Sequence, residues 1–111
     1  MANDTASGPN YEQAIINAAP GASGYWTDPV NPRGKSASKL FLSISETGAS
    51  ASFSATVTLQ FKPPNVDDWQ DYDTYTEETR QIIEDSGGCA WRAGVANGDY
   101  TDGEVTVEID W

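Results

Sequence analysis

Carboxylates are the side chains of this sequence that could do chemistry most directly. They are concentrated in the segment that holds Asp67, Asp68, Asp71, Asp73, Glu77, Glu78, Glu84 and Asp85. Two carboxylates are enough for glycoside hydrolysis, in which one acts as the acid and the other as base or nucleophile. Nothing in this polar segment marks one carboxylate for burial and a raised pKa. We therefore expect solvated charges and no hydrolytic pair.

The same segment could hold calcium through Asp71 and Asp73, because Ca²⁺ prefers carboxylate oxygens. An EF-hand loop needs a glycine and a terminal glutamate at fixed positions, and that pattern is absent here. We expect no dedicated metal site and no cofactor. Adventitious calcium on this segment remains the alternative.

Nucleophilic catalysis lacks its usual partners, since the chain has no histidine and a single cysteine, Cys89. Without histidine, Ser-His-Asp and Cys-His arrangements cannot form. Cys89 alternates with Trp91 and Ala93 in a strand-like run, which favours a buried thiol with no basic neighbour to activate it. A single cysteine also excludes an intrachain disulfide. We expect that the protein is not an enzyme.

Aromatic side chains offer a binding function instead, with four Trp and five Tyr in 111 residues. Trp69, Tyr72 and Tyr75 are candidates for a sugar-stacking platform on a sheet. Trp and Tyr are also enriched in protein interfaces. Both interpretations stay open at this point.

The charge is uneven along the chain. Residues 1–62 hold four acidic and four basic residues. Residues 63–111 hold thirteen acidic residues and only two basic ones, Arg80 and Arg92, so this second segment supplies the whole net charge of -11. Such a field repels nucleic acid, which binds Lys and Arg through its phosphates. No apolar run approaches the length of about 20 residues that a membrane helix needs. The N-terminus has no secretory signal pattern, so we expect synthesis in a reducing cytoplasm.

Period-two alternation of apolar residues is the main structural signal. It runs from Phe53 to Phe61, over Leu40–Glu46, from Cys89 to Val95 and from Val105 to Trp111. Alternation of this kind gives strands with one buried and one solvated face. The predicted core is Phe53, Val57, Leu59, Phe61, Trp91, Val105, Val107 and Ile109. With six to eight short strands separated by turns, the sequence predicts an all-β fold, an antiparallel β-sandwich or jelly roll.

Residues 1–39 are rich in Gly, Ala, Ser, Asn and Pro, and we expect an N-terminal arm with little regular structure before a sandwich domain at 40–111. Residues 11–19 fit either a short helix or an edge strand. A strand is preferred over a helix for residues 77–85. Asn97-Gly98 is the strongest hairpin signal, and Asp102-Gly103 indicates a bulge or second turn.

Several segments together resemble small virion proteins of tailed bacteriophages. They are Val57-Thr58-Leu59-Gln60, Pro63-Pro64, Asp68-Trp69, Trp91-Arg92-Ala93-Gly94-Val95 and Gly98-Asp99-Tyr100-Thr101. In length and sequence the chain is similar to the capsid decoration, or staple, proteins of epsilon15-type short-tailed phages. This resemblance implies a jelly-roll sandwich on the outer surface of an HK97-like capsid. It implies the major capsid protein as the partner, clamping of neighbouring capsomers near two-fold positions, and no catalytic residues. It leaves open a homodimer at those positions.

The residues expected to contact the capsid lie in the predicted arm. Arg33, Lys35 and Lys39 are the tightest basic group of the chain, and Tyr25 and Trp26 are a large aromatic pair nearby. A flexible basic segment on an acidic protein suits a neighbour that carries carboxylates. A carbohydrate-binding β-sandwich module on a virion or tail surface is the alternative function. A tail or head-completion protein is a third.

Overall fold

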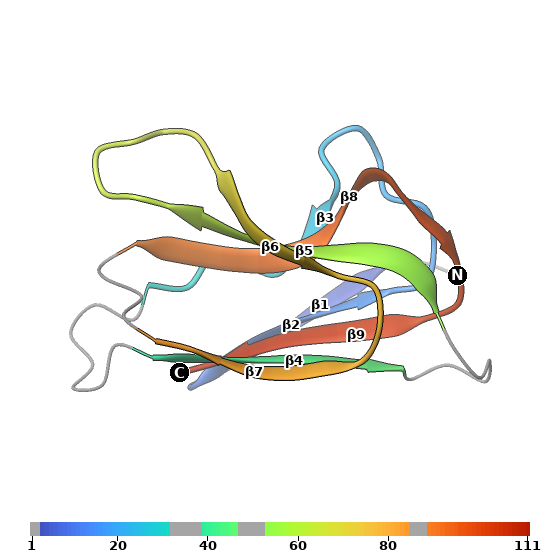
Figure 1. Cartoon of the computed structure of the whole chain (residues 1–111), viewed down its shortest axis with the longest axis horizontal. Coiled ribbons are helices and arrows are strands. Elements are labelled where there is room, and N and C mark those ends of the chain that lie inside the picture. The colour runs from blue at the N-terminus through green and yellow to red at the C-terminus, as the bar shows by residue number, and fades with distance from the viewer. Residues whose placement is uncertain (1–2, 32–38, 47–52, 85–88) are drawn as a thin grey trace.

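The computed structural model describes residues 3–31, 39–46, 53–84 and 89–111. They form two antiparallel sheets that pack face to face (Figure 1). In the five-stranded sheet the order is β1 (Asp4–Gly8), β2 (Tyr11–Ile16), β9 (Val105–Asp110), β4 (Leu40–Glu46) and β7 (Thr79–Ile83). In the four-stranded sheet it is β3 (Tyr25–Trp26), β8 (Ala90–Asp102), β5 (Ser54–Lys62) and β6 (Gln70–Tyr75). The prediction of an all-β antiparallel sandwich is confirmed.

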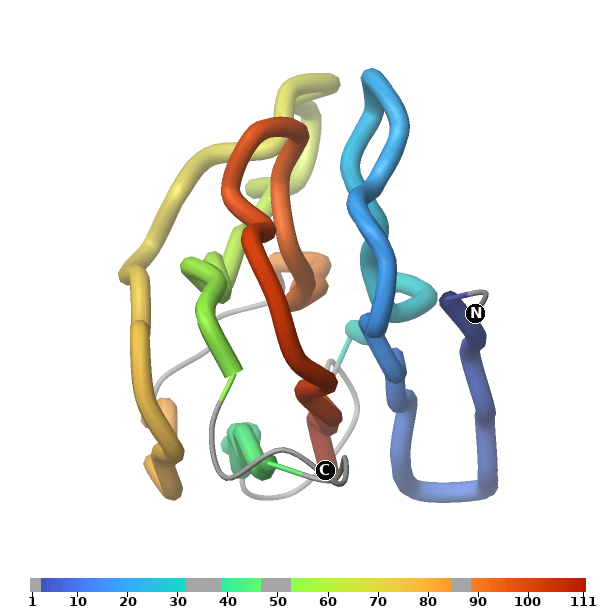
Figure 2. The backbone as a smooth tube through the Cα atoms, turned by 90° about the vertical axis from the view of Figure 1, so that its right-hand side faces the viewer, coloured from blue at the N-terminus to red at the C-terminus, as the bar shows by residue number. Residues whose placement is uncertain are grey.

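The core lies between the layers, which Figure 2 shows nearly end-on to the strands. Its largest fully buried side chains come from both sheets: Ile16, Leu40, Leu42, Ile44, Leu59, Ile83, Ile109, Val57, Val95, Val105 and Val107. Burying one such side chain stabilises the fold by about 1.5–3 kcal/mol. Seven of the eight predicted core residues are buried. Phe61 is only partly buried, because it lies near the end of β5 and packs against the rim of the core.

The prediction that residues 1–39 carry little regular structure is wrong for the described part of that segment. β1 and β2 form a hairpin whose second strand pairs with β9, and Ala14 and Ile16 are fully buried. β2 settles the alternative left open for residues 11–19 in favour of a strand. Its sequence signal is weak because its inner face carries only the small Ala14 beside Ile16. Pairing with Val105 and Val107 decides the conformation.

The predicted hairpin at Asn97-Gly98 is also wrong, since β8 continues through it. Gly98 has φ of 88° and lies between Val95 and Tyr100, where the register of β8 against β5 shifts. The glycine therefore allows an irregularity within the strand. The chain turns into β9 at Asp102-Gly103 instead, and Gly103 also has φ of 88°. The preference for a strand in residues 77–85 is confirmed by β7.

Gly94 allows the two-residue strand β3 to lie against β8. A Cβ atom at Gly94 would meet the carbonyl oxygen of Tyr25 and come within 2.8 Å of the Cα of Trp26. The contact is backbone against backbone, so a side chain could not turn away from it. Thr27 extends the attachment, because its amide donates to the carbonyl of Ala93 and its hydroxyl accepts from the amide of Ala93.

We predict that Gly94→Ala lowers the free energy of unfolding by about 3 kcal/mol, because overpacking forces backbone to move. Urea denaturation followed by fluorescence measures the change. Gly21→Ala is the matched control, since no atom lies within 4 Å of its added Cβ. That variant should stay within about 0.5 kcal/mol of the parent. Equal stability of the two variants would show that β3 does not rest on β8 in this way.

Candidate binding surface

A row of aromatic and cationic side chains crosses the outer face of the four-stranded sheet. Its members are Trp26, Arg92, Trp69 and Lys62, which we call the aromatic ladder. The Cζ atom of Arg92 lies 4.3 Å from the ring centroid of Trp26 and 4.5 Å from that of Trp69. The Nζ atom of Lys62 lies 5.2 Å from the Trp69 centroid. Each such cation–π contact stabilises by about 0.5–1 kcal/mol at an exposed site.

Strand register places these side chains on one face. Trp26 pairs with Gly94 and points outward, because its neighbour Tyr25 packs against the core. Arg92 points outward in turn, since Trp91 and Ala93 on either side of it are buried. The Trp26 ring is fixed further by its Nε1 group, which donates to the carbonyl of Ser23 at 2.7 Å. The ladder is therefore ordered before any partner arrives.

A chain of hydrogen bonds holds the guanidinium of Arg92 across three strands. Its Nε donates to Oε1 of Gln60 at 2.8 Å, and Nε2 of Gln60 donates to Oδ1 of Asp71 at 2.9 Å. Partial burial lowers the pKa of Arg92 from its usual value. Arginine nevertheless stays protonated in proteins. The ladder thus presents a positive charge, flanked by two indoles, on a strongly acidic chain.

This arrangement is suited to binding. Trp and Arg are the residue types that most often dominate protein interfaces, where they combine large apolar area with directed hydrogen bonds. A guanidinium can bind a carboxylate through two parallel hydrogen bonds. Because Gln60 and the two indoles already fix Arg92, little side-chain entropy is lost when a partner binds.

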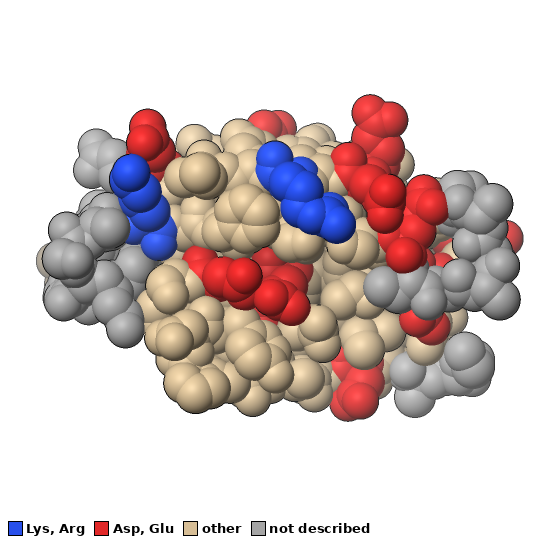
Figure 3. Space-filling model, turned by 90° about the horizontal axis from the view of Figure 1, so that it is seen from below, with Lys and Arg blue, Asp and Glu red and all other residues tan. Residues whose placement is uncertain are grey.

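The outer face of the five-stranded sheet has a different character. Phe41 and Ile82 are 37% and 59% exposed there, beside a hollow of about 310 Å³ that Asp110 and Trp111 also line. Figure 3 shows this face, with acidic atoms near its middle, a basic side chain close to them and mainly uncharged atoms around. Glu108 and Asp110 both point outward from the central strand β9, because Val107 and Ile109 point into the core.

These two carboxyls interact with one another. A side-chain hydrogen bond with Asp110, followed by burial and the charge of Asp110, raises the pKa of Glu108. Nε2 of Gln13 donates to Oε1 of Glu108 at 3.0 Å, which acts in the opposite direction. Such a carboxyl–carboxyl bond requires a proton on one partner. The buried Oδ1 of Asp110 has no hydrogen-bond partner among the residues that the structure describes.

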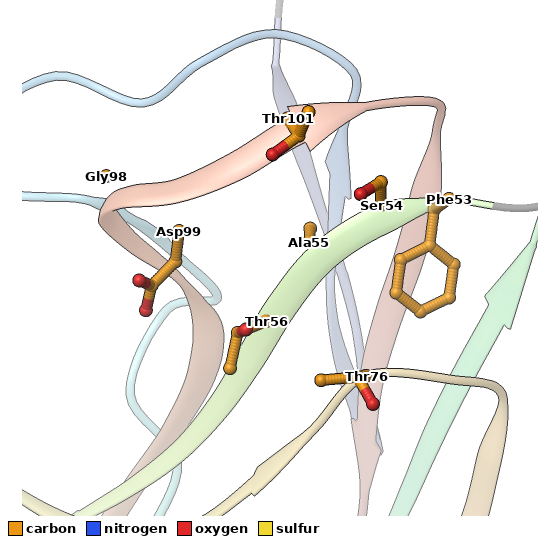
Figure 4. A pocket seen from close by; sticks show the side chains of 8 residues that line it. All are labelled: Phe53, Ser54, Ala55, Thr56, Thr76, Gly98, Asp99 and Thr101. Carbon is orange, nitrogen blue, oxygen red and sulfur yellow. The ribbon is translucent and has the colours of Figure 1, made fainter.

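A polar hollow of about 320 Å³ opens at the irregular part of β8 (Figure 4). Its lining is Phe53, Ser54, Ala55, Thr56, Thr76, Gly98, Asp99 and Thr101. The hydroxyls and the Asp99 carboxylate could hydrogen-bond a polar ligand. Phe53 is buried, so the lining presents no exposed ring for stacking.

The structure does not bring the sequence-predicted contact residues together. Trp26 belongs to the ladder, but Tyr25 packs against the core. Lys39 lies beside the five-stranded sheet, where its Nζ is 3.6 Å from Oε1 of Glu84. Arg33 and Lys35 lie outside the described residues. Sequence reasoning missed Arg92 as a site residue. The alternation of apolar residues places the Arg92 side chain outward. Its contact with Trp26 depends on the register between β3 and β8, and no sequence pattern predicts that register.

The three aromatic residues considered for sugar stacking do not form one platform. Trp69 contacts the outward Arg92, whereas Tyr72 packs against Phe61 and Trp91 with ring centroids 6.3 and 5.2 Å away. Tyr75 packs against the core, and its hydroxyl donates to Oε1 of Gln81 at 2.9 Å. Burial, with a contribution from Asp73, raises the pKa of Tyr75 to about 12.

The residues considered for calcium and for thiol chemistry are placed as follows. Oδ1 of Asp71 accepts from Gln60, and Oδ1 of Asp73 accepts from the amide of Thr74. Within the described part of the chain, no three acidic or thiol side chains are grouped to hold a metal ion. Cys89 is half-buried and packs against the core.

Comparison with known proteins bears on the fold. The chain is similar to a crystal structure described as SPBc2 prophage-derived protein YomS, with a TM-score of 0.51 and 14% sequence identity. The match covers 94% of this chain and 96% of that one, so the similarity in fold extends over most of both chains. No protein-family model matches the sequence, and no curated protein matches it either. Among the described residues there is no helix of the length and apolarity needed to span a membrane.

We predict that Arg92→Met lowers the free energy of unfolding by about 1–2 kcal/mol, because it removes two cation–π contacts and a hydrogen bond. Urea denaturation measures this loss. Lys39→Met is the control, since it changes the charge equally but removes only an exposed ion pair, which contributes under about 0.5 kcal/mol. If both variants lose the same stability, the ladder is not an ordered unit.

The raised pKa of Glu108 has a consequence for stability. Because the pKa of Glu108 is raised in the folded state, protonated Glu108 contributes to the free energy of unfolding. This stabilisation is complete below the ordinary glutamate pKa of about 4.3 and is lost as the pH rises through the raised pKa. Asp110→Asn removes the opposing charge. It should therefore be more stable than the parent at pH 7 by about 0.5 kcal/mol, since water screens the pair.

Urea midpoints at pH 7 and pH 4 test this expectation. The gain of Asp110→Asn should exceed that of Asp68→Asn, which changes the net charge equally at an exposed position. It should also shrink in acid. An equal gain in both variants, or a gain that grows in acid, would contradict the assigned coupling.

Proposed function

We propose that this protein is a structural component of a bacteriophage virion, that it binds the outer surface of an HK97-like capsid, and that it staples neighbouring capsomers. The observation that carries the proposal is the aromatic ladder, a rigid row of two tryptophans and two cations on one sheet face. Such a face fits a protein neighbour that presents carboxylates beside apolar surface. The prophage origin of the protein with a similar fold agrees with this proposal.

The strand order supports the jelly-roll assignment that the resemblance implies. Setting β1 aside, the sheets read β2-β9-β4-β7 and β3-β8-β5-β6. Consecutive strands alternate between layers from β2 to β5 and again from β6 to β9, and the antiparallel pair β5 and β6, which lies within one sheet, joins the two runs. Double-sheet jelly rolls of eight strands recur in viral capsid proteins and lectins. Because lectins also use this fold, a carbohydrate-binding module is the second candidate function. The presence of Trp26 and Trp69 on one sheet face favours it. Arg92 fills the space between those rings, so we rank sugar binding below protein binding.

The proposal includes a binding role without catalysis, with the major capsid protein as the partner. Stapling adds contacts only in the assembled shell, so it stabilises the shell by mass action. Arg33, Lys35 and Lys39 remain proposed as a further capsid contact, beside the ladder.

Attachment to purified shells that lack this protein tests the docking face. We predict that Trp69→Ala reduces occupancy at a fixed concentration at least tenfold, because truncating a central aromatic anchor costs about 2 kcal/mol or more. Sedimentation of shells and gel quantification measure occupancy. Val66→Ser is the matched control, because Val66 is an exposed apolar residue that is not a member of the ladder. Undiminished occupancy with Trp69→Ala would show that the ladder does not form the contact with the shell.

Two further measurements separate stapling from simple attachment. Shells that carry the protein should rupture at a higher temperature than bare shells, and identical rupture would contradict stapling. A variant with Arg33, Lys35 and Lys39 changed to Glu should attach more weakly. Normal attachment of that variant would confine the contact to the sheet faces.

A further inference from the structure

The outer face of the five-stranded sheet carries a cross-strand row in which one carboxylate lies among aromatic and aliphatic side chains. Strand register places Tyr11, Asp110, Phe41 and Ile82 side by side across β2, β9, β4 and β7. Directly opposed residues of this kind have Cβ atoms about 4.5–5.5 Å apart. Ile82 is 59% exposed, and Phe41 and Trp111 line the hollow beside it. One carboxylate thus lies within an exposed apolar surface.

The next row adds a second carboxylate. Glu108 lies between Gln13 on β2 and Ser43 on β4, and Nε2 of Gln13 donates to its side chain. Oδ1 of Asp110 is shielded from water and finds no hydrogen-bond donor among the described residues. Asp110 also lines the hollow beside Phe41 and Ile82, from which a cation could reach its carboxylate. The side-chain hydrogen bond with Asp110, then burial and the charge of Asp110, raise the pKa of Glu108, which agrees with two close carboxyls that have no paired cation among the described residues.

The cations of this face are engaged elsewhere. Lys39 lines the hollow, but its Nζ pairs with Glu84 at 3.6 Å. Nη1 of Arg80 donates to the carbonyls of Ile44 and Thr79 at 2.9 and 3.1 Å. Among the residues that the structure describes, no cation forms an ion pair with Glu108 or Asp110.

We propose that this face binds an arginine side chain of a partner protein. The guanidinium would bind Glu108 and Asp110, and its aliphatic stem would pack on Phe41, Ile82 and Trp111. Charge complementarity selects a cation, and the apolar surface selects a long stem. Arginine fits better than lysine because its planar guanidinium is weakly hydrated and donates to two carboxylates at once. The inference goes beyond the proposed capsid binding and does not depend on it.

Acetyl-arginine-amide is a suitable probe, and acetyl-citrulline-amide is its uncharged isostere. Each is titrated into the isotopically labelled protein at pH 7, and backbone amide shifts are followed by NMR. We expect saturable shifts in β9, in β4 near Phe41 and in β7 near Ile82. Citrulline should bind at least tenfold more weakly. Equal binding of the two probes, or shifts confined to the acidic segment around Asp68, would overturn the proposal.

Variants complete the test. Asp110→Asn and Glu108→Gln should each weaken arginine binding at least fivefold, and Asp110→Asn should do so while the fold becomes more stable. Asp68→Asn, which changes the net charge equally, should bind as the parent does. Retained binding in Asp110→Asn would overturn the proposal.

Discussion

The burial of one face of every central strand is the constraint on which the rest of the structure depends. β9 shows it most fully, since Val105, Val107 and Ile109 are all inaccessible to solvent between β2 and β4. A slip of one residue would bring Glu108 and Asp110 into the core and expose the three aliphatic side chains. The hydrophobic core thereby fixes which polar residues face outward. In the same way, the burial of Trp91 and Ala93 on either side of Arg92 fixes the outward direction of the Arg92 side chain.

The two outer faces that result are opposite in chemistry. One presents Arg92 held between Trp26 and Trp69, and the other presents Glu108 and Asp110 beside Phe41 and Ile82. A domain with a cationic aromatic face and an acidic apolar face can contact two different neighbours at once. That geometry suits a protein that links subunits. A net charge of -11 opposes the association of such domains with one another.

Sequence reasoning succeeded where one strand face is buried and alternation is strong, as in β4, β5 and β9. It failed for β2, whose small Ala14 gives little signal and whose conformation depends on pairing with β9. It failed again at Asn97-Gly98, because a glycine with positive φ serves a bulge as well as a hairpin. The ladder could not be foreseen, since Arg92 meets Trp26 only through the close approach of β3 at Gly94.

Hydroxyl-radical footprinting of the protein, free and bound to shells, tests the central claim that the ladder is the docking face. Oxidation of Trp26 and Trp69 is measured by mass spectrometry, with Tyr100 on the same strand as Arg92 as an internal reference. The account predicts strong protection of both tryptophans on the shell and unchanged oxidation of Tyr100. Equal oxidation of Trp26 and Trp69 in the free and bound states would contradict it.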